Sequence, residues 1–372
     1  MNFEFSDEQN LLREQAAGFL GDKCPPSAVR AVLEGDVSFD AELFRGMAEM
    51  GWTAVTIPEK HGGLELSYLE LCVIAEELGR AVAPVPFSSS IYLATEALLL
   101  AGSEAQRQSW LPKVASGEAI GAYALVEGPG QPSRNRLATS YANGTVTGTK
   151  LPVADGDIAD FAVVVAKSVQ GDGANLCLVP LDSPRVTRTR VETLDPTRSH
   201  ARIEFDRAPA ELIGVAGQGW SLTRRILDRA AVLFAWEQVG GANAALEQAK
   251  EYAMGRYAFG RPIAGFQAIK HKLANMFVKN TLARSNCYYG AWALSTDAGE
   301  LPLAAATARV SAIQAYYFAS KENIQTHGGM GFTWEFDCQF HYRRAKLLSV
   351  NIGSERLWQD RLISAIEAAQ AA

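Results

Sequence analysis

Cysteine is scarce in this sequence, and the few cysteines form no pattern. There are five, an odd number, and none belongs to a C-x-x-C pair: Cys24, Cys72, Cys177, Cys287 and Cys338. Such scattered thiols favour a reducing compartment over a disulfide framework, so we expect the protein to be cytoplasmic. The five histidines are equally dispersed and show no H-E-x-x-H spacing, so no metal site is expected.

Four further features are missing. No apolar run is long enough to span a bilayer, and the acidic start, Met1-Asn-Phe-Glu-Phe-Ser-Asp-Glu, lacks the basic residues and apolar stretch of a signal peptide. The net charge is -6 and no basic stripe is interleaved with aromatics, so nucleic acid is not an expected partner. No G-x-G-x-x-G occurs, which argues against a Rossmann-type dinucleotide site.

The length of the chain and its changing composition predict several domains. At 372 residues it exceeds the roughly 250–300 residues that one hydrophobic core usually serves. The composition is helical at first, then β-rich, then helical again. We therefore predict an α+β protein with an N-terminal helical domain (1–118), a central antiparallel, barrel-like β domain (119–215) and a C-terminal four-helix bundle (216–372).

Local signals place elements within these zones. Ser6 is a typical N-cap, and Asn143-Gly144 is a strong hairpin signal. The middle zone has six short β-rich runs: 120–125, 141–148, 161–166, 176–179, 186–191 and 201–205. The last zone has four helical patterns: 220–257, 267–297, 302–326 and 336–368. Its apolar runs 303–306 and 315–319 favour buried helix faces, some of them between subunits.

Two segments of the last zone carry possible binding chemistry. The first reads Arg256-Tyr-Ala-Phe-Gly260-Arg-Pro-Ile-Ala-Gly-Phe-Gln267, and the second reads Gln325-Thr-His-Gly-Gly-Met-Gly-Phe332. A guanidinium beside a glycine turn can grip a pyrophosphate with two hydrogen bonds, and consecutive glycines let the backbone approach a ligand closely. Each segment alone also fits a plain helix end, with Arg256 as a solvated charge and the glycines as a stop signal.

Together the two segments resemble the cofactor-clamping segments of the acyl-CoA dehydrogenase family. The pairing of R-x-x-F-G-x-P-I-x-x-F-Q with Q-x-H-G-G-x-G-F is specific. Four further segments extend the resemblance over the chain in the expected order: Gly51-Trp-Thr, Pro58-Glu-x-x-Gly-Gly63, Glu76-Glu77-Leu-Gly79 and Trp110-Leu-Pro-Lys-Val-Ala-Ser-Gly117.

The resemblance implies an FAD-dependent enzyme of two or four subunits. In the family, a carboxylate removes the α-proton of an acyl-CoA thioester and the β-hydrogen leaves as hydride to the flavin. The product is a 2-enoyl-CoA, and electrons pass on to an electron-transferring flavoprotein. The flavin of one subunit has its ADP half held by residues of the neighbour, which match Arg256, Phe259, Gln267, Gln325, Gly328 and Gly329 here.

The sequence departs from the family where the base is expected. The family's Tyr-Glu-Gly-Thr segment reads Asn351-Ile352-Gly353-Ser354 here, so isoleucine replaces the glutamate. Some members carry the base on the long preceding helix instead, and counting back from Arg256 places Ala230 there. Neither side chain can accept a proton.

The β segments that face the flavin in the family also differ. Val126 stands where the family has a threonine, and Gly130-Gln-Pro-Ser-Arg replaces a Gly-Ser-Asp segment. Pro152-Val-Ala154 replaces Trp-Ile-Thr. The hydroxyl donors and the covering indole are therefore missing, while the ADP-side residues are present.

Two carboxylates remain as candidate bases. Asp228 lies two residues before Ala230, nearly on the opposite helix face at about 100° per residue. Glu237 lies seven residues after Ala230, on the same face but about 10 Å further along. Its apolar surroundings suit a base. Alternatively, Glu237 is bonded to a neighbouring helix or to a partner subunit.

Three interpretations follow from these residues. In the first, the chain is the subunit without a base in a heteromeric acyl-CoA dehydrogenase, such as a heterotetramer, similar to those of bacterial pathways that degrade steroid side chains or dicarboxylic acids. In the second, it is a self-sufficient homo-oligomer that uses Glu237 or Asp228. In the third, it is a non-catalytic scaffold, against which the retained clamp residues argue.

Overall fold

The computed structural model describes residues 5–169 and 173–371, and the chain folds into two compact units. The first, which we call the helical unit, contains the described residues up to Arg30, Tyr68–Ala83 and the chain from Ala231 on. The second, the sheet unit, contains Ala31–Ser67 and Pro84–Ala230. The domain boundaries at 118 and 215 stay predictions.

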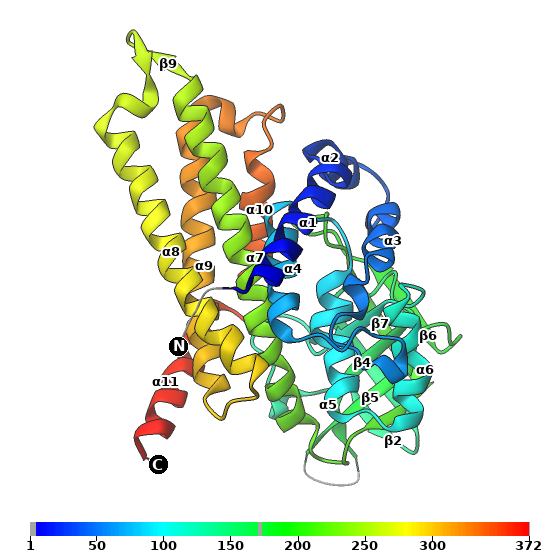
Figure 1. Cartoon of the computed structure of the whole chain (residues 1–372). Coiled ribbons are helices and arrows are strands. Elements are labelled where there is room, and N and C mark those ends of the chain that lie inside the picture. The colour runs from blue at the N-terminus through cyan, green and yellow to red at the C-terminus, as the bar shows by residue number, and fades with distance from the viewer. Residues whose placement is uncertain (1–4, 170–172, 372) are drawn as a thin grey trace. The chain divides into compact units, whose positions relative to one another are not determined.

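The helical unit is built mainly from long helices. In Figure 1, α7, α8 and α9 run side by side, and the hairpin of β9 (Tyr257–Ala258) and β10 (Arg261–Pro262) lies at one end of them. The helices that contribute to this unit are α1 (Asp7–Lys23), α2 (Pro26–Glu34), α4 (Tyr68–Arg80), α7 (Gly219–Gly255), α8 (Gln267–Ser295), α9 (Leu301–His327), α10 (Cys338–Leu348) and α11 (Glu355–Ala371), with the short turns η5 (Ile263–Gly265) and η6 (Gly328–Phe332).

The predicted helix over 336–368 is wrong as one element, because the chain forms α10 and α11 with a break between them. Gly353 has φ +112°, outside the helical region, and a Cβ there would lie 2.4 Å from Leu357 Cδ2. The apolar pattern continues on both sides of the break, which is why periodicity alone joins the two helices. Among the described residues from 216 on, the chain therefore forms five α-helices, α7 to α11, instead of the four predicted.

Two glycines let α4 and α7 pack with their backbones in contact. A Cβ on Gly79 would lie 1.8 Å from the carbonyl oxygen of Glu237, and a Cβ on Gly240 would lie 1.8 Å from that of Glu76. Only glycine fits at such a distance. This crossing places Glu76 and Glu237 inside the unit, where both are almost completely buried.

The sheet unit combines short helices with one mixed sheet. The helical elements are α3 (Ala41–Glu49), η1 (Trp52–Ala54), η2 (Glu59–His61), the π-helix η3 (Ser88–Thr95), α5 (Glu96–Ala101), α6 (Glu104–Ala115) and η4 (Arg134–Arg136). The strands are β1 (Gly121–Ala124), β2 (Ser140–Ala142), β3 (Thr145–Ala154), β4 (Phe161–Ser168), β5 (Ala174–Pro180), β6 (Val186–Arg190), β7 (His200–Pro209) and β8 (Glu211–Ile213). Their order is β6-β7-β3-β2-β4-β5-β8, and β1 also pairs with β4.

The predicted hairpin is confirmed, and the strand direction needs one correction. Asn143 and Gly144 have φ of 50° and 76°, as a two-residue type I′ turn requires, and they join β2 to β3. However, β1 and β2 both run parallel to β4, so the sheet is mixed instead of antiparallel. The run Phe161–Ala166 is completely buried, as is typical of a strand covered on both faces.

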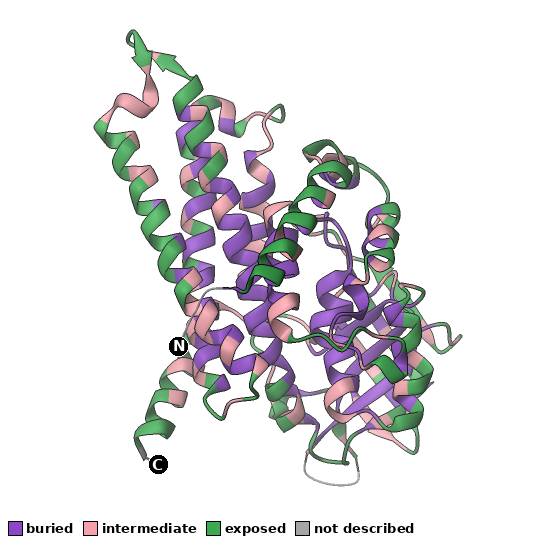
Figure 2. Cartoon of the chain, in the orientation of Figure 1, coloured by how far each residue is buried: buried purple, intermediate pink, exposed green. Residues whose placement is uncertain are grey.

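The α+β class is confirmed. Figure 2 shows which parts of each helix and strand are buried. The inner faces of the long helices are buried, whereas α8 exposes Phe277, Val278 and Leu282 on its outer face by 62%, 52% and 61%. Among the described residues, no helix combines the length and the apolar character needed to cross a membrane.

Candidate cofactor and substrate site

The first half of the predicted ADP clamp lies where α7 ends. The backbone N–H of Arg256 donates to the carbonyl of Tyr252 (2.8 Å), so Arg256 directly follows the last helical turn with its side chain exposed. The β9–β10 turn then carries Phe259 at φ +52° and Gly260 at φ +79°. Phe259 is 96% exposed and meets the ring of Phe266 edge-on at 6.2 Å.

The second half lies at the end of α9. Gly328 has φ +61° and ψ -135°, which suits glycine alone, and a Cβ on Gly328 or Gly329 would meet no atom within 4 Å. The backbone of this turn therefore faces open space. Gln325 is exposed in the last turn of α9, and Gln267 is exposed at the start of α8.

All six predicted clamp residues thus lie in the helical unit, at one end of α7, α8 and α9. A guanidinium, two amides and a glycine backbone are the donors that a pyrophosphate needs. This set lies on an exposed end of the three helices.

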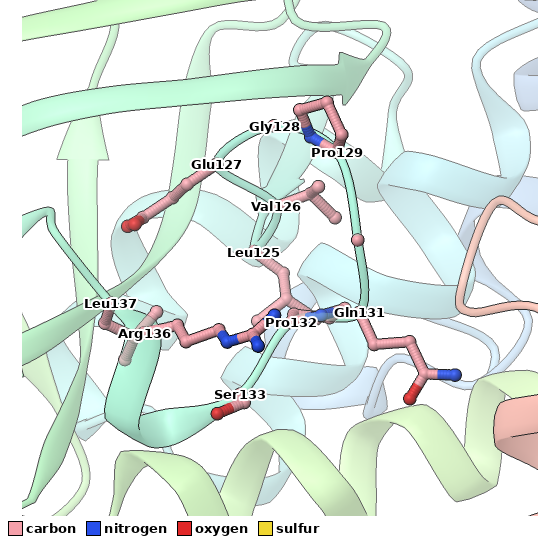
Figure 3. A pocket seen from close by; sticks show the side chains of 11 residues that line it. Leu125, Val126, Glu127, Gly128, Pro129, Gln131, Pro132, Ser133, Arg136 and Leu137 are labelled. Atoms are coloured by element: carbon pink, nitrogen blue, oxygen red, sulfur yellow. The ribbon is translucent and has the colours of Figure 1, made fainter.

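A separate cavity of about 200 Å³ lies in the sheet unit, between β1 and η4. Figure 3 shows the loop that surrounds it, with the side chain of Arg136 reaching across toward Pro132. The lining residues are Leu125, Val126, Glu127, Gly128, Pro129, Gly130, Gln131, Pro132, Ser133, Arg136 and Leu137. Ser133 supplies the one side-chain hydroxyl of this lining, and two of its residues are prolines, which lack a backbone N–H.

A buried ion pair anchors this loop. The Lys150 ammonium, with no exposed side-chain surface, donates to Glu127 Oε1 (2.7 Å) and to the carbonyl of Leu125 (3.1 Å). Glu127 in turn accepts the backbone N–H groups of Ala138 (2.6 Å) and Thr139 (3.0 Å). One pair of side chains therefore joins both ends of the loop to β3.

The titration of this pair follows from its burial. Burial lowers the pKa of Lys150 to about 8, although the hydrogen bond and charge of Glu127 act in the opposite direction. Burial alone raises the pKa of Glu127, but the hydrogen bonds from Lys150 and Ala138 and the Lys150 charge outweigh it, so its pKa lies below the ordinary value. At neutral pH the pair is ionised.

The two positions where the sequence lacks a base are both buried. Ile352 is 6% exposed, and its N–H donates to Asn351 Oδ1 (3.0 Å), which also accepts from the fully buried Arg309 (2.8 Å). Ala230 is completely buried in α7. Neither side chain can accept a proton.

The two candidate bases have different surroundings. Asp228 is 6% exposed and lies in the part of α7 that belongs to the sheet unit. Glu237 has no exposed surface, and the equally buried Arg344 of α10 lies 3.5 Å from its Oε1. Arg344 also donates to the carbonyls of Val82 and Ala83 (3.3 and 3.4 Å). Glu237 is therefore bonded to a neighbouring helix, as one of the two readings of the sequence expected.

Comparison with known proteins identifies the chain. The family model described as "Acyl-CoA dehydrogenase, N-terminal domain" matches residues 6–118, and "Acyl-CoA dehydrogenase, C-terminal domain" matches residues 217–365. The chain is also 34% identical over 342 residues to acyl-CoA dehydrogenase IpdE2 of Mycobacterium tuberculosis, which covers 91% of each chain. The chain belongs to the acyl-CoA dehydrogenase family.

Two more members of this family are similar over almost the whole chain. The short-chain specific acyl-CoA dehydrogenase of Homo sapiens is 30% identical over 370 residues, covering 95% of this chain and 89% of that one. A structure of the ChsE4–ChsE5 complex from Mycobacterium tuberculosis superimposes with a TM-score of 0.90 at 25% identity and 99% coverage of both chains. The predicted acyl-CoA dehydrogenase-like fold is thereby confirmed.

Membership also confirms the predicted cofactor and class of activity. The cofactor of this family is FAD, and the chain is an oxidoreductase that acts on acyl-CoA. The ADP half of FAD fits the donors at the exposed end of α7 and α9. The sheet-unit loop fits a flavin ring less well, because Ser133 supplies the one side-chain hydroxyl of its lining.

Sequence reasoning missed several buried cationic side chains of this acyl-CoA dehydrogenase. Lys150, Arg309 and Arg344 are each buried and bonded, yet no motif singled them out. The available signal was a single charge inside an otherwise apolar stretch, such as Arg309 in Ala304-Ala-Ala-Thr-Ala-Arg309. Packing between distant elements decides which oxygen atom accepts hydrogen bonds from such a charge.

Proposed function

We propose that this chain is the subunit without a base in a heteromeric FAD-dependent acyl-CoA dehydrogenase. It dehydrogenates an acyl-CoA thioester to a 2-enoyl-CoA together with a homologous chain. In that assembly it supplies the ADP clamp, and the partner supplies the flavin ring site and the catalytic carboxylate. The observation that carries the proposal is the contrast between a complete clamp and an absent base in the same chain.

The clamp supports a role toward another subunit. Its residues are exposed except Gly328, which is half-buried, and a Cβ on Gly328 or Gly329 would meet no atom within 4 Å. A family member with no use for FAD would have no reason to keep Arg256, Gln325 and both glycines together. Retention of this constellation is therefore the argument against a scaffold that has lost the cofactor.

The surroundings of Glu237 support a base outside this chain. An α-proton of a thioester is only weakly acidic, so a carboxylate must lie within about 3 Å of it. Glu237 is held by Arg344 in the interior of the helical unit. A carboxylate in a hydrogen-bonded buried pair is costly to move, because its partner would be left as an uncompensated buried charge.

The relatives support the heteromeric arrangement and its context. ChsE4–ChsE5 is, by its printed name, a complex of two chains. We extend such pairing to this protein, with a heterotetramer as the expected assembly. FAD supplies the hydride acceptor when it is bound. We expect an electron-transferring flavoprotein to reoxidise the enzyme, in the cytoplasm.

The experiment is the visible absorption spectrum of the chain purified alone and after co-expression with a homologous subunit from the same source. We expect little flavin in the chain alone and about one FAD per two chains in the co-purified complex. About one FAD per chain alone, with acyl-CoA dehydrogenation that Glu237→Gln abolishes, would establish the self-sufficient enzyme instead. If no assembly contains flavin, the chain is a non-catalytic scaffold instead.

A further inference from the structure

Three aromatic rings connect the two halves of the clamp. Tyr252, in the last turn of α7, stacks on His327, the last residue of α9, with ring centroids 4.1 Å apart and an interplanar angle of 28°. Phe336 meets both rings edge-on, at 6.0 Å from Tyr252 and 5.7 Å from His327. We call these three residues the ring cluster. All of them belong to the helical unit.

Each helix-borne ring is directly attached to a clamp segment. Tyr252 accepts at its carbonyl the N–H of Arg256, one turn further on. His327 lies two residues after Gln325 and directly before Gly328 in the chain. The stack therefore joins the guanidinium end of the clamp to its glycine end through side chains, although Arg256 and Gly328 are 72 residues apart in the sequence.

The orientation of the His327 ring is fixed from the other side. Its Nδ1 lies 2.9 Å from the carbonyl of Asn323, and since a carbonyl can only accept, Nδ1 carries the proton. Asn323 also donates from Nδ2 to Gln248 Oε1 (2.9 Å), one turn before Tyr252 on α7. His327 is 7% exposed, and burial lowers the pKa of its imidazole, which keeps the ring neutral.

The surrounding chain offers little other packing to hold the clamp. Beyond the rings, Met254, Tyr257 and Phe259 are exposed by 59%, 64% and 96%. Helix ends without buried contacts open locally at low cost. A stacked pair placed one turn before the exposed tip can therefore decide whether the two halves keep a fixed separation.

We infer that Tyr252, His327 and Phe336 are positioning residues for the cofactor, which set the distance between Arg256 and the Gly328–Gly329 backbone so that both reach one diphosphate group. The inference rests on the proposed assignment of these clamp residues to the ADP half of FAD. The rings themselves need not touch the cofactor. Preorganised donors lose less conformational freedom on binding, and this raises affinity.

The test compares ring-removing and ring-keeping variants in the flavin-binding complex. After removal of FAD, the complex is titrated with FAD and, separately, with ADP. We expect Tyr252→Leu to weaken both ligands about tenfold, in keeping with the loss of one aromatic pair. Tyr252→Phe keeps the ring and should retain most of the affinity. His327→Leu and His327→Phe form a second pair with the same expected contrast.

A matched control separates positioning from general stability. Tyr289→Leu removes another stacked aromatic of the same unit, Tyr289 on Trp292 at 6.1 Å and 12°, and should leave FAD affinity unchanged. The inference is overturned if Tyr252→Leu binds FAD like the wild type, or if Tyr252→Phe loses as much FAD affinity as Tyr252→Leu. It is also overturned if Tyr252→Leu lowers the melting temperature or the subunit affinity of the FAD-free complex by as much as it does in the FAD-bound complex.

Arg256→Ala distinguishes a failure of the ring cluster from a failure of the clamp assignment. If Arg256→Ala weakens FAD and Tyr252→Leu does not, the ring cluster has no positioning role and the clamp stands. If neither variant changes the affinity for FAD or ADP, the assignment of the clamp itself is wrong.

Discussion

Single buried side chains give this protein a measurable pH dependence. His341 of α10 is buried beside Tyr316, whose hydroxyl lies 3.1 Å from its Nδ1. Burial lowers the pKa of His341 to about 3, and the charges of Arg344 and Arg80 act in the same direction. The unfolded chain takes up a proton at this residue below about pH 6.5, whereas the folded chain takes it up only near pH 3. Stability is therefore lost as the pH falls through this window.

His341→Gln should remove this part of the acid sensitivity. Urea unfolding at about pH 7.5 and about pH 5 should show that the wild type loses about 2 kcal/mol more than the variant between the two values. Tyr316→Phe is the control, because it removes the hydroxyl and keeps the histidine, and should retain the wild-type slope. Equal slopes in His341→Gln and wild type would place the acid sensitivity elsewhere.

Glu237 offers a second test at the scale of one residue. Since its carboxylate faces the buried Arg344, Glu237→Gln should destabilise the chain by about 3–5 kcal/mol and leave the turnover of the remaining folded enzyme nearly intact. Glu247→Gln is a matched control: Glu247 pairs with Arg80 at 2.5 Å with 62% of its side chain exposed, and should cost at most about 1 kcal/mol. A stable Glu237→Gln enzyme without turnover would instead make Glu237 the base.

At the scale of elements, the crossing of α4 and α7 determines whether the helical unit forms. Gly240→Ala would bring a Cβ to 1.8 Å from the carbonyl oxygen of Glu76, which the rigid helix backbone can relieve only by moving α4. We expect a loss of more than about 3 kcal/mol in unfolding free energy, or failure to fold. The measurement is chemical denaturation of the purified variant.

Gly255→Ala is the control for that substitution. Gly255 ends α7, and a Cβ there would meet no atom within 4 Å. Alanine is the better helix former, so this variant should be neutral or stabilised by up to about 1 kcal/mol. Similar losses at both positions would mean that helix propensity, not the close crossing, limits the fold.

At the scale of the whole molecule, the outer face of α8 should mediate assembly. Phe277 and Leu282 are both more than half exposed although both are large and apolar. Such a patch marks a protein interface. The double variant Phe277→Lys with Leu282→Lys should shift the protein to monomers in light scattering. On the proposal that the clamp serves another subunit, the variant should lose FAD at the same time.

Leu11→Lys is the control for this variant. Leu11 is an apolar side chain that is 56% exposed, but it lies on a different helix, α1. It should keep both oligomeric state and FAD content. Monomers that still hold FAD would contradict the sharing of the cofactor between subunits.

The sequence by itself determined the features whose chemistry is local. The Asn143-Gly144 turn and the Ser6 cap each depend on a few neighbouring residues, so they could be predicted. The clamp and the missing base at Ile352 follow from the family resemblance and stay predictions. Even the class of fold followed, because helical and β-rich zones succeed one another along the chain.

Only the tertiary structure decided what depends on contacts between distant segments. The partner of Glu237 is 107 residues away in Arg344, and the stack of Tyr252 on His327 spans 75 residues. The parallel pairing of β1 and β2 with β4 belongs to the same class. Periodicity reports which face of an element is buried, but it carries no information on which distant group that face meets.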